Sequence, residues 1–187
     1  MSTTVTADLL VSVDGWARGL DSPGFFGYAG PELMQWIGDQ SAAHHDLMGR
    51  RTYEMLASMP ADERETRTTT TVFSRTLRET TWENTTIESG DAIEAVRELR
   101  SASLPLRTVG SLSLVRQLLD AGLVDRLRLW LFPLLVGPGG REAALAGVGE
   151  RDLDLVDHRV LDGRIILLEY APTDRGIPHA SATDPAS

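Results

Sequence analysis

Asp46-Leu47-Met48-Gly49-Arg50-Arg51-Thr52 is the stretch of sequence that decides the fold. Its first three residues form a short strand candidate, and Gly49 allows the chain to turn sharply after them. The apolar residues between 51 and 59 then recur at helical spacing. A strand that runs through one glycine into a helix is typical of a parallel α/β sheet.

Strands and helices alternate on both sides of this junction. The patterns predict strands at 5–13, 69–74, 85–87, 106–109 and 127–136, and helices at 31–43, 91–99 and 112–121. Two more strands, at 154–160 and 164–170, flank Asp162-Gly163, which is the signal of a type I′ hairpin. We therefore expect an α/β fold with a mixed, mostly parallel sheet, flanking helices and a C-terminal antiparallel hairpin.

The length of 187 residues and the hydrophobic content of 42% favour one domain, spanning residues 1–172. The segment 173–187 has scattered small, polar and proline residues and is predicted to be a disordered tail. The chain has no run of about 18 apolar residues, and it begins with polar residues instead of an export signal. Because it also lacks cysteine, we expect a cytoplasmic protein without a membrane segment.

The net charge of −9 and the pI of about 4.9 argue against a nucleic-acid or anionic membrane partner, since both need clustered positive charge. All 18 basic residues are arginine, which excludes Schiff-base lysine chemistry and a lysine-dependent phosphate loop. The four histidines show no metal-ligand spacing with acids, and no metal is expected. Two of them, His44 and His45, are predicted to end the first helix.

Three loops follow predicted strands and open helices or turns: Gly49-Arg50-Arg51-Thr52, Ser74-Arg75-Thr76 and Gly110-Ser111-Leu112-Ser113. The carboxyl ends of parallel strands meet at one edge of a sheet, where helix N-termini offer N–H groups to anions. With their glycines, hydroxyls and arginines, the loops together predict a phosphate-binding rim. Each loop alone is also compatible with an ordinary turn carrying surface arginines.

Five segments carry a family resemblance, and they are Val11-Ser12-Val13-Asp14-Gly15, Leu47-Met48-Gly49-Arg50-Arg51-Thr52-Tyr53-Glu54, Thr108-Val109-Gly110-Ser111, Leu123-Val124-Asp125 and Pro133-Leu134-Leu135-Val136-Gly137-Pro138-Gly139. As a set they resemble the dihydrofolate reductase superfamily. They are most similar to the branch containing the C-terminal reductase domain of the bifunctional riboflavin-biosynthesis deaminase-reductase. The similarity spans residues 5 to 171. It implies a mixed sheet of about eight strands, NADPH as hydride donor, a small-molecule substrate and often a homodimer.

The resemblance also implies roles for particular residues. The glycine-arginine turn would hold cofactor phosphates, Ser74 with Arg75 would lie near the adenosine 2′-phosphate, and Gly110-Ser111 would meet the pyrophosphate. The end of the first strand would border the nicotinamide and the substrate. The cofactor-binding residues expected in this way are Leu10, Ala17, Gly49, Arg50, Arg51, Thr52, Ser74, Arg75, Gly110, Ser111 and Leu112.

Hydride transfer to a C=N or C=O bond needs a proton source, and Asp14 and Glu32 are the candidate catalytic acids. The alternative is that Asp14 only shapes the turn before Gly15 and that Glu32 matches the helix dipole, and turn and dipole chemistry favour this alternative for both residues. Trp16 stands where riboflavin-type reductases often carry a lysine, which argues against a ribose-phosphate substrate.

The aromatic residues Phe25, Phe26, Tyr28 and Trp36 are compatible with the wall of a ring-binding pocket or with core packing. Our first hypothesis is an NADPH-dependent reductase of a small heterocyclic or carbonyl substrate. The alternative is a catalytically idle protein of the same fold that binds a nucleotide or acts as an accessory protein.

Overall fold

The computed structural model describes residues 3–22, 24–40, 44–59, 68–101 and 104–178. The strands are β1 (Val5–Ser12), β2 (Trp16–Gly19), β3 (His45–Gly49), β4 (Thr69–Phe73), β5 (Thr85–Glu88), β6 (Leu106–Thr108), β7 (Arg126–Phe132), β8 (Gly140–Ala143), β9 (Leu153–Leu161) and β10 (Ile165–Pro172). The helices are α1 (Pro31–Asp39), α2 (Arg50–Ala57), α3 (Ala92–Leu99) and α4 (Leu112–Asp120), and the 3-10 turns are η1 (Phe26–Tyr28) and η3 (Gly137–Gly139).

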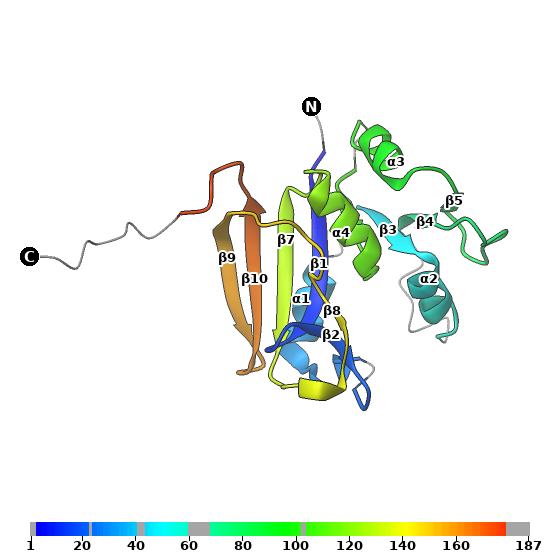
Figure 1. The fold of residues 1–187 in the computed structure, drawn as a ribbon. Coiled ribbons are helices and arrows are strands. Elements are labelled where there is room, and N and C mark those ends of the chain that lie inside the picture. Colours follow the sequence, from blue (N-terminus) through cyan, green and yellow to red (C-terminus); the bar gives the residue numbers. More distant parts are fainter. Residues whose placement is uncertain (1–2, 23, 41–43, 60–67, 102–103, 179–187) are drawn as a thin grey trace, which may run out of the picture.

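The main sheet has eight strands in the order β5-β4-β3-β6-β1-β7-β10-β9. All neighbours from β5 to β7 run parallel, and β10 pairs antiparallel with both β7 and β9. The expected mixed, mostly parallel sheet with a C-terminal hairpin is therefore confirmed (Figure 1). At the hairpin turn, Asp162 and Gly163 have φ values of 52° and 66°, as a type I′ turn requires.

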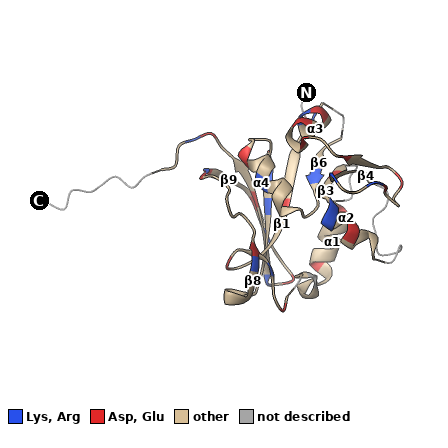
Figure 2. Cartoon of the chain, turned by 45° about the vertical axis from the view of Figure 1, so that its right-hand side comes forward, with Lys and Arg blue, Asp and Glu red and all other residues tan. Residues whose placement is uncertain are grey.

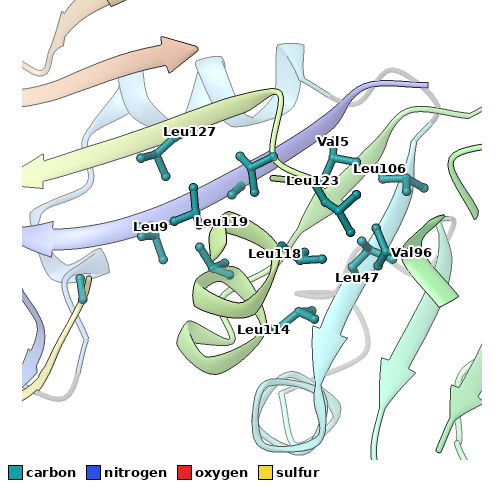
Figure 3. Packing of buried hydrophobic residues seen from close by; sticks show 14 of the residues in the cluster. Val5, Leu9, Leu47, Val96, Leu106, Leu114, Leu118, Leu119, Leu123 and Leu127 are labelled. Carbon is teal, nitrogen blue, oxygen red and sulfur yellow. The ribbon is translucent and has the colours of Figure 1, made fainter. Parts of the chain in front are cut away.

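Alternation along β1 sends apolar side chains to the face covered by α3 and α4. Val5 and Leu9 pack there with Val96 of α3 and with Leu114 and Leu118 of α4 (Figure 3). Full burial of one such side chain stabilises the fold by roughly 1.5–3 kcal/mol. This cluster fixes β1 in the middle of the sheet.

The opposite face of the sheet is covered by α1 and α2. Leu33 and Trp36 of α1 pack on Trp130, Phe132 and Leu167 of β7 and β10. Met48 points away from Leu47, which belongs to the α4 cluster, and it packs with Tyr53 of α2. Both faces of the sheet are thus covered at its centre.

The N-terminus of α1 is capped from the hairpin rather than from its own sequence. Gly30 is the N-cap residue and has no side chain, and the Asp162 carboxylate accepts hydrogen bonds from the amides of Gly30, Glu32 and Leu33. A Cβ on Gly30 would lie 2.4 Å from Asp162 Oδ1, so only glycine allows this approach. The hairpin turn and α1 are therefore joined directly.

The sequence patterns missed a two-stranded ribbon. β2 and β8 pair antiparallel, and no strand was predicted at either segment. The predicted extension of the seventh strand to Val136 is also wrong. β7 ends at Phe132 because the next residue, Pro133, has no N–H to give to the sheet.

The assignment of His44 and His45 to the end of the first helix is wrong. The helix ends at Asp39, and His45 begins β3. Both histidines are buried, His44 lies 3.1 Å from the Asp46 carboxylate, and His45 Nε2 is 2.8 Å from Thr71 Oγ1. They belong to the sheet interior because β3 pairs with β6 from His45 onward.

The chain beyond β10 is described as far as residue 178. Thr173 and Arg175 bond the Asp152 carboxylate, and Arg175 also pairs with Asp154. Residues 179–187 of the tail that was predicted to be disordered lie outside the described part. Among the described helices, none has the length and apolar character needed to cross a membrane.

Candidate functional site

The N-termini of α2 and α4 open onto one cavity at the carboxyl edge of the sheet. The cavity has a volume of about 430 Å³ and is lined by Gly49, Arg50, Arg51, Thr52, Phe73, Ser111, Leu112, Ser113, Arg116 and Glu142. The first amides of a helix have no acceptor within the helix, and the helix dipole places positive charge there. We call this space the first cavity, and its two helix ends suit an anion.

Ser111 ties the two loops together. Its Oγ accepts a hydrogen bond of 2.5 Å from the Gly49 amide and lies 3.0 Å from Thr52 Oγ1. A Cβ on Gly49 would be 3.0 Å from Ser111 Oγ, and one on Gly110 would be 3.2 Å from Thr52 Oγ1. Both positions therefore use glycine for close approach, and the two helix ends are held side by side.

Three arginines line the first cavity but differ in their partners. Arg50 gives two hydrogen bonds, of 2.8 and 2.9 Å, to Glu54 one helical turn later. Arg116 donates to the carbonyls of residues 143 and 144 and joins α4 to β8. Arg51 has 85% of its side chain exposed and lies 3.9 Å from Glu142. Figure 2 shows the basic segment at the start of α2. Of these three guanidinium groups, that of Arg51 has the longest contact with its partner.

A second cavity lies on the α1 face of the sheet. Its volume is about 170 Å³, and its lining is Asp8, Leu10, Trp36, Ile37, Gln40, Arg107, Thr108, Val109, Gly110, Arg128 and Trp130. Gly110 borders this cavity, whereas the next residue, Ser111, borders the first one. The two cavities therefore adjoin at the Gly110-Ser111 turn.

One charged pair stands in the second cavity among aromatic side chains. Arg128 Nη2 donates to Asp8 Oδ2 over 2.6 Å, and the Trp130 indole donates to Asp8 Oδ1 over 3.0 Å. The guanidinium of Arg128 lies 5.1 Å from the centre of the Trp36 ring, which packs edge-on against Trp130. Asp8 and Arg128 are only 8% and 6% exposed.

The Asp14 carboxylate accepts three hydrogen bonds. The Ser12 hydroxyl donates to Asp14 Oδ1 over 2.7 Å, and the amides of Val136 and Gly137 donate over 3.1 and 2.7 Å. These bonds, with the Ser12 hydroxyl as the largest cause, lower the pKa of Asp14 from 3.8 to about 2. At neutral pH the group is an anion that holds the turn after β7 against the end of β1.

Glu32 forms hydrogen bonds with Asp162 in the turn of the β9–β10 hairpin. Its carboxylate accepts a hydrogen bond from the Asp162 amide, while its own amide donates to the Asp162 carboxylate. It borders neither the first nor the second cavity. This exchange supports a structural role for Glu32 at the start of α1.

Residues 3–167 match the profile of the RibD C-terminal domain. The chain belongs to the RibD C-terminal domain family. No curated protein matches the sequence.

Solved structures agree with the fold of this RibD C-terminal domain. A putative riboflavin biosynthesis protein from Shewanella sp. PV-4 superimposes with a TM-score of 0.76 at 15% identity, covering 92% of this chain and 99% of that chain. A pyrimidine reductase-like protein from Corynebacterium diphtheriae gives 0.70 at 16% identity, covering 92% and 93%.

A diaminohydroxyphosphoribosylaminopyrimidine deaminase/5-amino-6-(5-phosphoribosylamino)uracil reductase from Thermotoga maritima gives a TM-score of 0.67 at 14% identity. The match covers 92% of this chain and 57% of that chain. Together with the strand order, these likenesses identify the fold as the dihydrofolate reductase-like α/β fold.

The RibD C-terminal domain brings only part of the expected site together. Gly49, Arg50, Arg51, Thr52, Ser111 and Leu112 line the first cavity, and Leu10 and Gly110 line the second. Ser74 and Arg75 lie on the loop after β4, outside both cavities, and Ser74 Oγ accepts the amides of Thr76 and Leu77. Ala17 lies in β2 and packs on the cluster under α4.

Of the aromatic residues expected either to wall a ring-binding pocket or to pack in the core, one lines a cavity and two pack in the core. Trp36 lines the second cavity, whereas Phe25 and Tyr28 pack on Phe132, with ring centres 5.4 and 6.3 Å apart. Trp16 lines neither cavity of this RibD C-terminal domain. A Cβ on Gly140 would lie 2.2 Å from its ring, so the indole rests on the backbone of β8.

Sequence reasoning missed Asp8, Arg128 and Trp130, as well as Arg116 and Glu142. The first three lie on neighbouring strands, and no short motif joins them. A usable signal was the acid among the apolar residues of the first predicted strand, since a buried carboxylate needs a partner.

Proposed function

We propose that this protein is an NADPH-dependent reductase that transfers a hydride to a small heterocyclic or carbonyl substrate. The observation that carries the proposal is the adjacency of two cavities, one suited to phosphate and one lined by aromatic rings, on either side of Gly110-Ser111. Membership in the RibD C-terminal domain family supports a reductase with a nicotinamide cofactor.

The residues of the first cavity fit a dinucleotide. The amides at the start of α2 and α4 and the exposed guanidinium of Arg51 would hold its phosphates. Gly49 and Gly110 present no Cβ to block a pyrophosphate. Arg75, on the neighbouring loop after β4, would meet the adenosine 2′-phosphate. When bound, NADPH supplies a hydride.

The substrate would occupy the second cavity, beside the Gly110 turn. Asp14 carries no proton at neutral pH because its pKa is about 2, and Glu32 is bonded to the hairpin. We therefore assign the proton that follows the hydride to solvent, which reaches both cavities. The chain's own residues bind and orient the two reactants.

The proposed cofactor site is tested by titrating NADPH into the protein and following the heat of binding. Ser111→Ala removes the hydroxyl that joins the two loops, and we expect it to weaken NADPH about fivefold to tenfold. Ser101→Ala is the matched control, since the Ser101 hydroxyl donates to the Glu98 carbonyl near the end of α3 and lines neither cavity. Failure of the wild-type protein to bind NADPH would contradict the proposal.

The reductase activity is tested by NADPH oxidation with pterins, aminopyrimidines and α,β-unsaturated carbonyls. We expect turnover with at least one class. Tight NADPH binding without oxidation by any of them would favour the catalytically idle alternative. We also propose that the protein acts in the cytoplasm, since a chain without cysteine suits a reducing compartment.

A further inference from the structure

The second cavity carries a buried ion pair in a lining that is otherwise mostly apolar. Asp8 and Arg128 form it, and both are buried: the Trp130 indole donates to Asp8, and Arg128 lies over the Trp36 ring. Burying two charges costs several kcal/mol in desolvation, and well-packed apolar side chains often do as well or better in such a place. Stability alone therefore does not explain an ion pair at the wall of a cavity.

The pair keeps unused hydrogen-bonding capacity. A carboxylate has about four acceptor positions, and the Asp8 side chain uses one on each oxygen. A guanidinium has five N–H donors, and Arg128 gives one to Asp8 and one to Gln40. Its Nε is buried and has no hydrogen-bond partner. The wall thus offers an acceptor next to a donor.

We propose that the Asp8–Arg128 pair determines substrate specificity by binding the lactam edge of an uncharged planar heterocycle. The ring N–H donates to the Asp8 carboxylate, and the adjacent C=O accepts from Arg128. The indoles of Trp36 and Trp130 form the apolar walls for the ring. This inference rests on the proposed function, because it concerns the cavity assigned to the hydride acceptor.

The cavity also limits the size and charge of the ligand. Its volume of about 170 Å³ is below the range of roughly 300–1,000 Å³ usual for ligand sites. Its other arginine, Arg107, is already paired with Asp46 at 3.3 Å. The indole of Trp16 rests on Gly140, so the position after the Asp-Gly pair adds no cation. A bare ring fits these conditions, and a ring carrying a sugar phosphate does not.

The test uses 5,6-diaminouracil and its 1,3-dimethyl derivative, which lacks both ring N–H donors. Binding is followed by the fluorescence of Trp36 and Trp130, which line the cavity. We expect the wild-type protein to bind diaminouracil at least about tenfold more tightly, the effect of one hydrogen bond to a charged group. Uridine 5′-monophosphate keeps a lactam edge and adds a sugar phosphate, and we expect it to bind at least about tenfold more weakly than diaminouracil.

Asp8→Asn tests the residue itself. It removes the charged acceptor at almost constant shape, and the preference for the N–H ligand should fall below about threefold. Asp125→Asn is the matched control, since Asp125 pairs with Arg100 at 2.9 Å outside both cavities. It should keep the wild-type preference. If Asp8→Asn does not fold, the ligand comparison on the wild-type protein decides.

Equal binding of the two uracils by the wild-type protein, or a preference retained in Asp8→Asn, overturns the assignment of Asp8. Binding of the monophosphate as tight as that of diaminouracil overturns the limit on size and charge. NADPH is titrated into the same samples. A protein that binds NADPH and shows no lactam preference disproves this inference alone, whereas one that fails to bind NADPH disproves the proposed function.

Discussion

Ser111 occupies a left-handed conformation, with φ of 64°, directly after Gly110 at 58°. For a residue with a Cβ this conformation costs roughly 1–2 kcal/mol, whereas glycine adopts it freely. Here the cost is offset by the hydroxyl contacts with Gly49 and Thr52. The residue that joins the two helix ends is thus kept in a strained backbone position.

This strain gives a prediction about two substitutions that both remove the hydroxyl. Ser111→Gly should be more stable than Ser111→Ala by about 1 kcal/mol, because only glycine relieves the left-handed strain. Urea unfolding of both variants measures the difference. Equal free energies of unfolding would mean that the backbone relaxes in the alanine variant.

Asp14 makes stability depend on pH in a defined direction. Its folded pKa, about 2, lies below the ordinary value of 3.8, so its contribution is full above about pH 4 and is lost as the pH falls through 2. Asp14→Asn should therefore melt at a lower temperature than the wild-type protein at pH 7, and the difference should shrink toward pH 2. A difference in melting temperature that is constant over this range would contradict the assignment.

At the scale of elements, the strand-glycine-helix junction was predictable because its signals are local. Gly49 breaks an apolar strand and a helical period follows within a few residues. The ribbon of β2 and β8 was not, because each strand has four residues and they pair across more than 120 positions. Short segments such as Trp16–Gly19 carry no periodicity to detect.

The residues of the candidate site also fall into a group that the sequence predicts and a group that it does not. Gly49 to Thr52 and Ser111 were predictable because both loops open helices. The second cavity was not, since Asp8 and Arg128 come from different strands and meet only through the β1–β7 register. The alternation of Arg126, Arg128 and Trp130 with leucines predicts a strand with one covered face, but α1 covers the other face as well.

The loops after β3 and β4 should divide the recognition of NADPH between them. β4 lies next to β3 and farther from the centre of the sheet, so Arg75 should meet the 2′-phosphate and Arg51 the pyrophosphate. Arg75→Ala should weaken NADPH at least about tenfold and NADH little, whereas Arg51→Ala should weaken both. The exposed Arg78 on the same loop provides the control, Arg78→Ala. An equal loss of both cofactors in Arg75→Ala would refute this division.

At the scale of the whole molecule, β9 is an edge strand with exposed apolar side chains. Val156 and Val160 are 47% and 61% exposed. Antiparallel pairing of two copies about His158 would set Asp157 opposite the second copy's Arg159, and Val156 opposite its Val160. The strand is thus complementary to itself in charge and shape, and we expect a homodimer through β9.

Val160→Lys should weaken this dimer at least about tenfold, because two lysines would enter an apolar contact. Analytical ultracentrifugation over a range of concentrations measures the dimer. Met55→Lys, at an exposed position of α2, which packs on β3 and β4 toward the other end of the sheet, should leave it unchanged. A wild-type protein that is monomeric at all concentrations would contradict the expectation.

The central place of β1 also has a consequence for synthesis on the ribosome. β1 pairs with β6, where Val5 lies opposite Leu106. It also pairs with β7 along its length, as far as Ser12 opposite Phe132. A nascent chain therefore carries β1 without either neighbour until more than half of the residues have been made, and without β7 until more than two thirds have been made. During that interval the apolar side chains of β1 are available to chaperones, and a stall in translation before Phe132 would leave them exposed to aggregation.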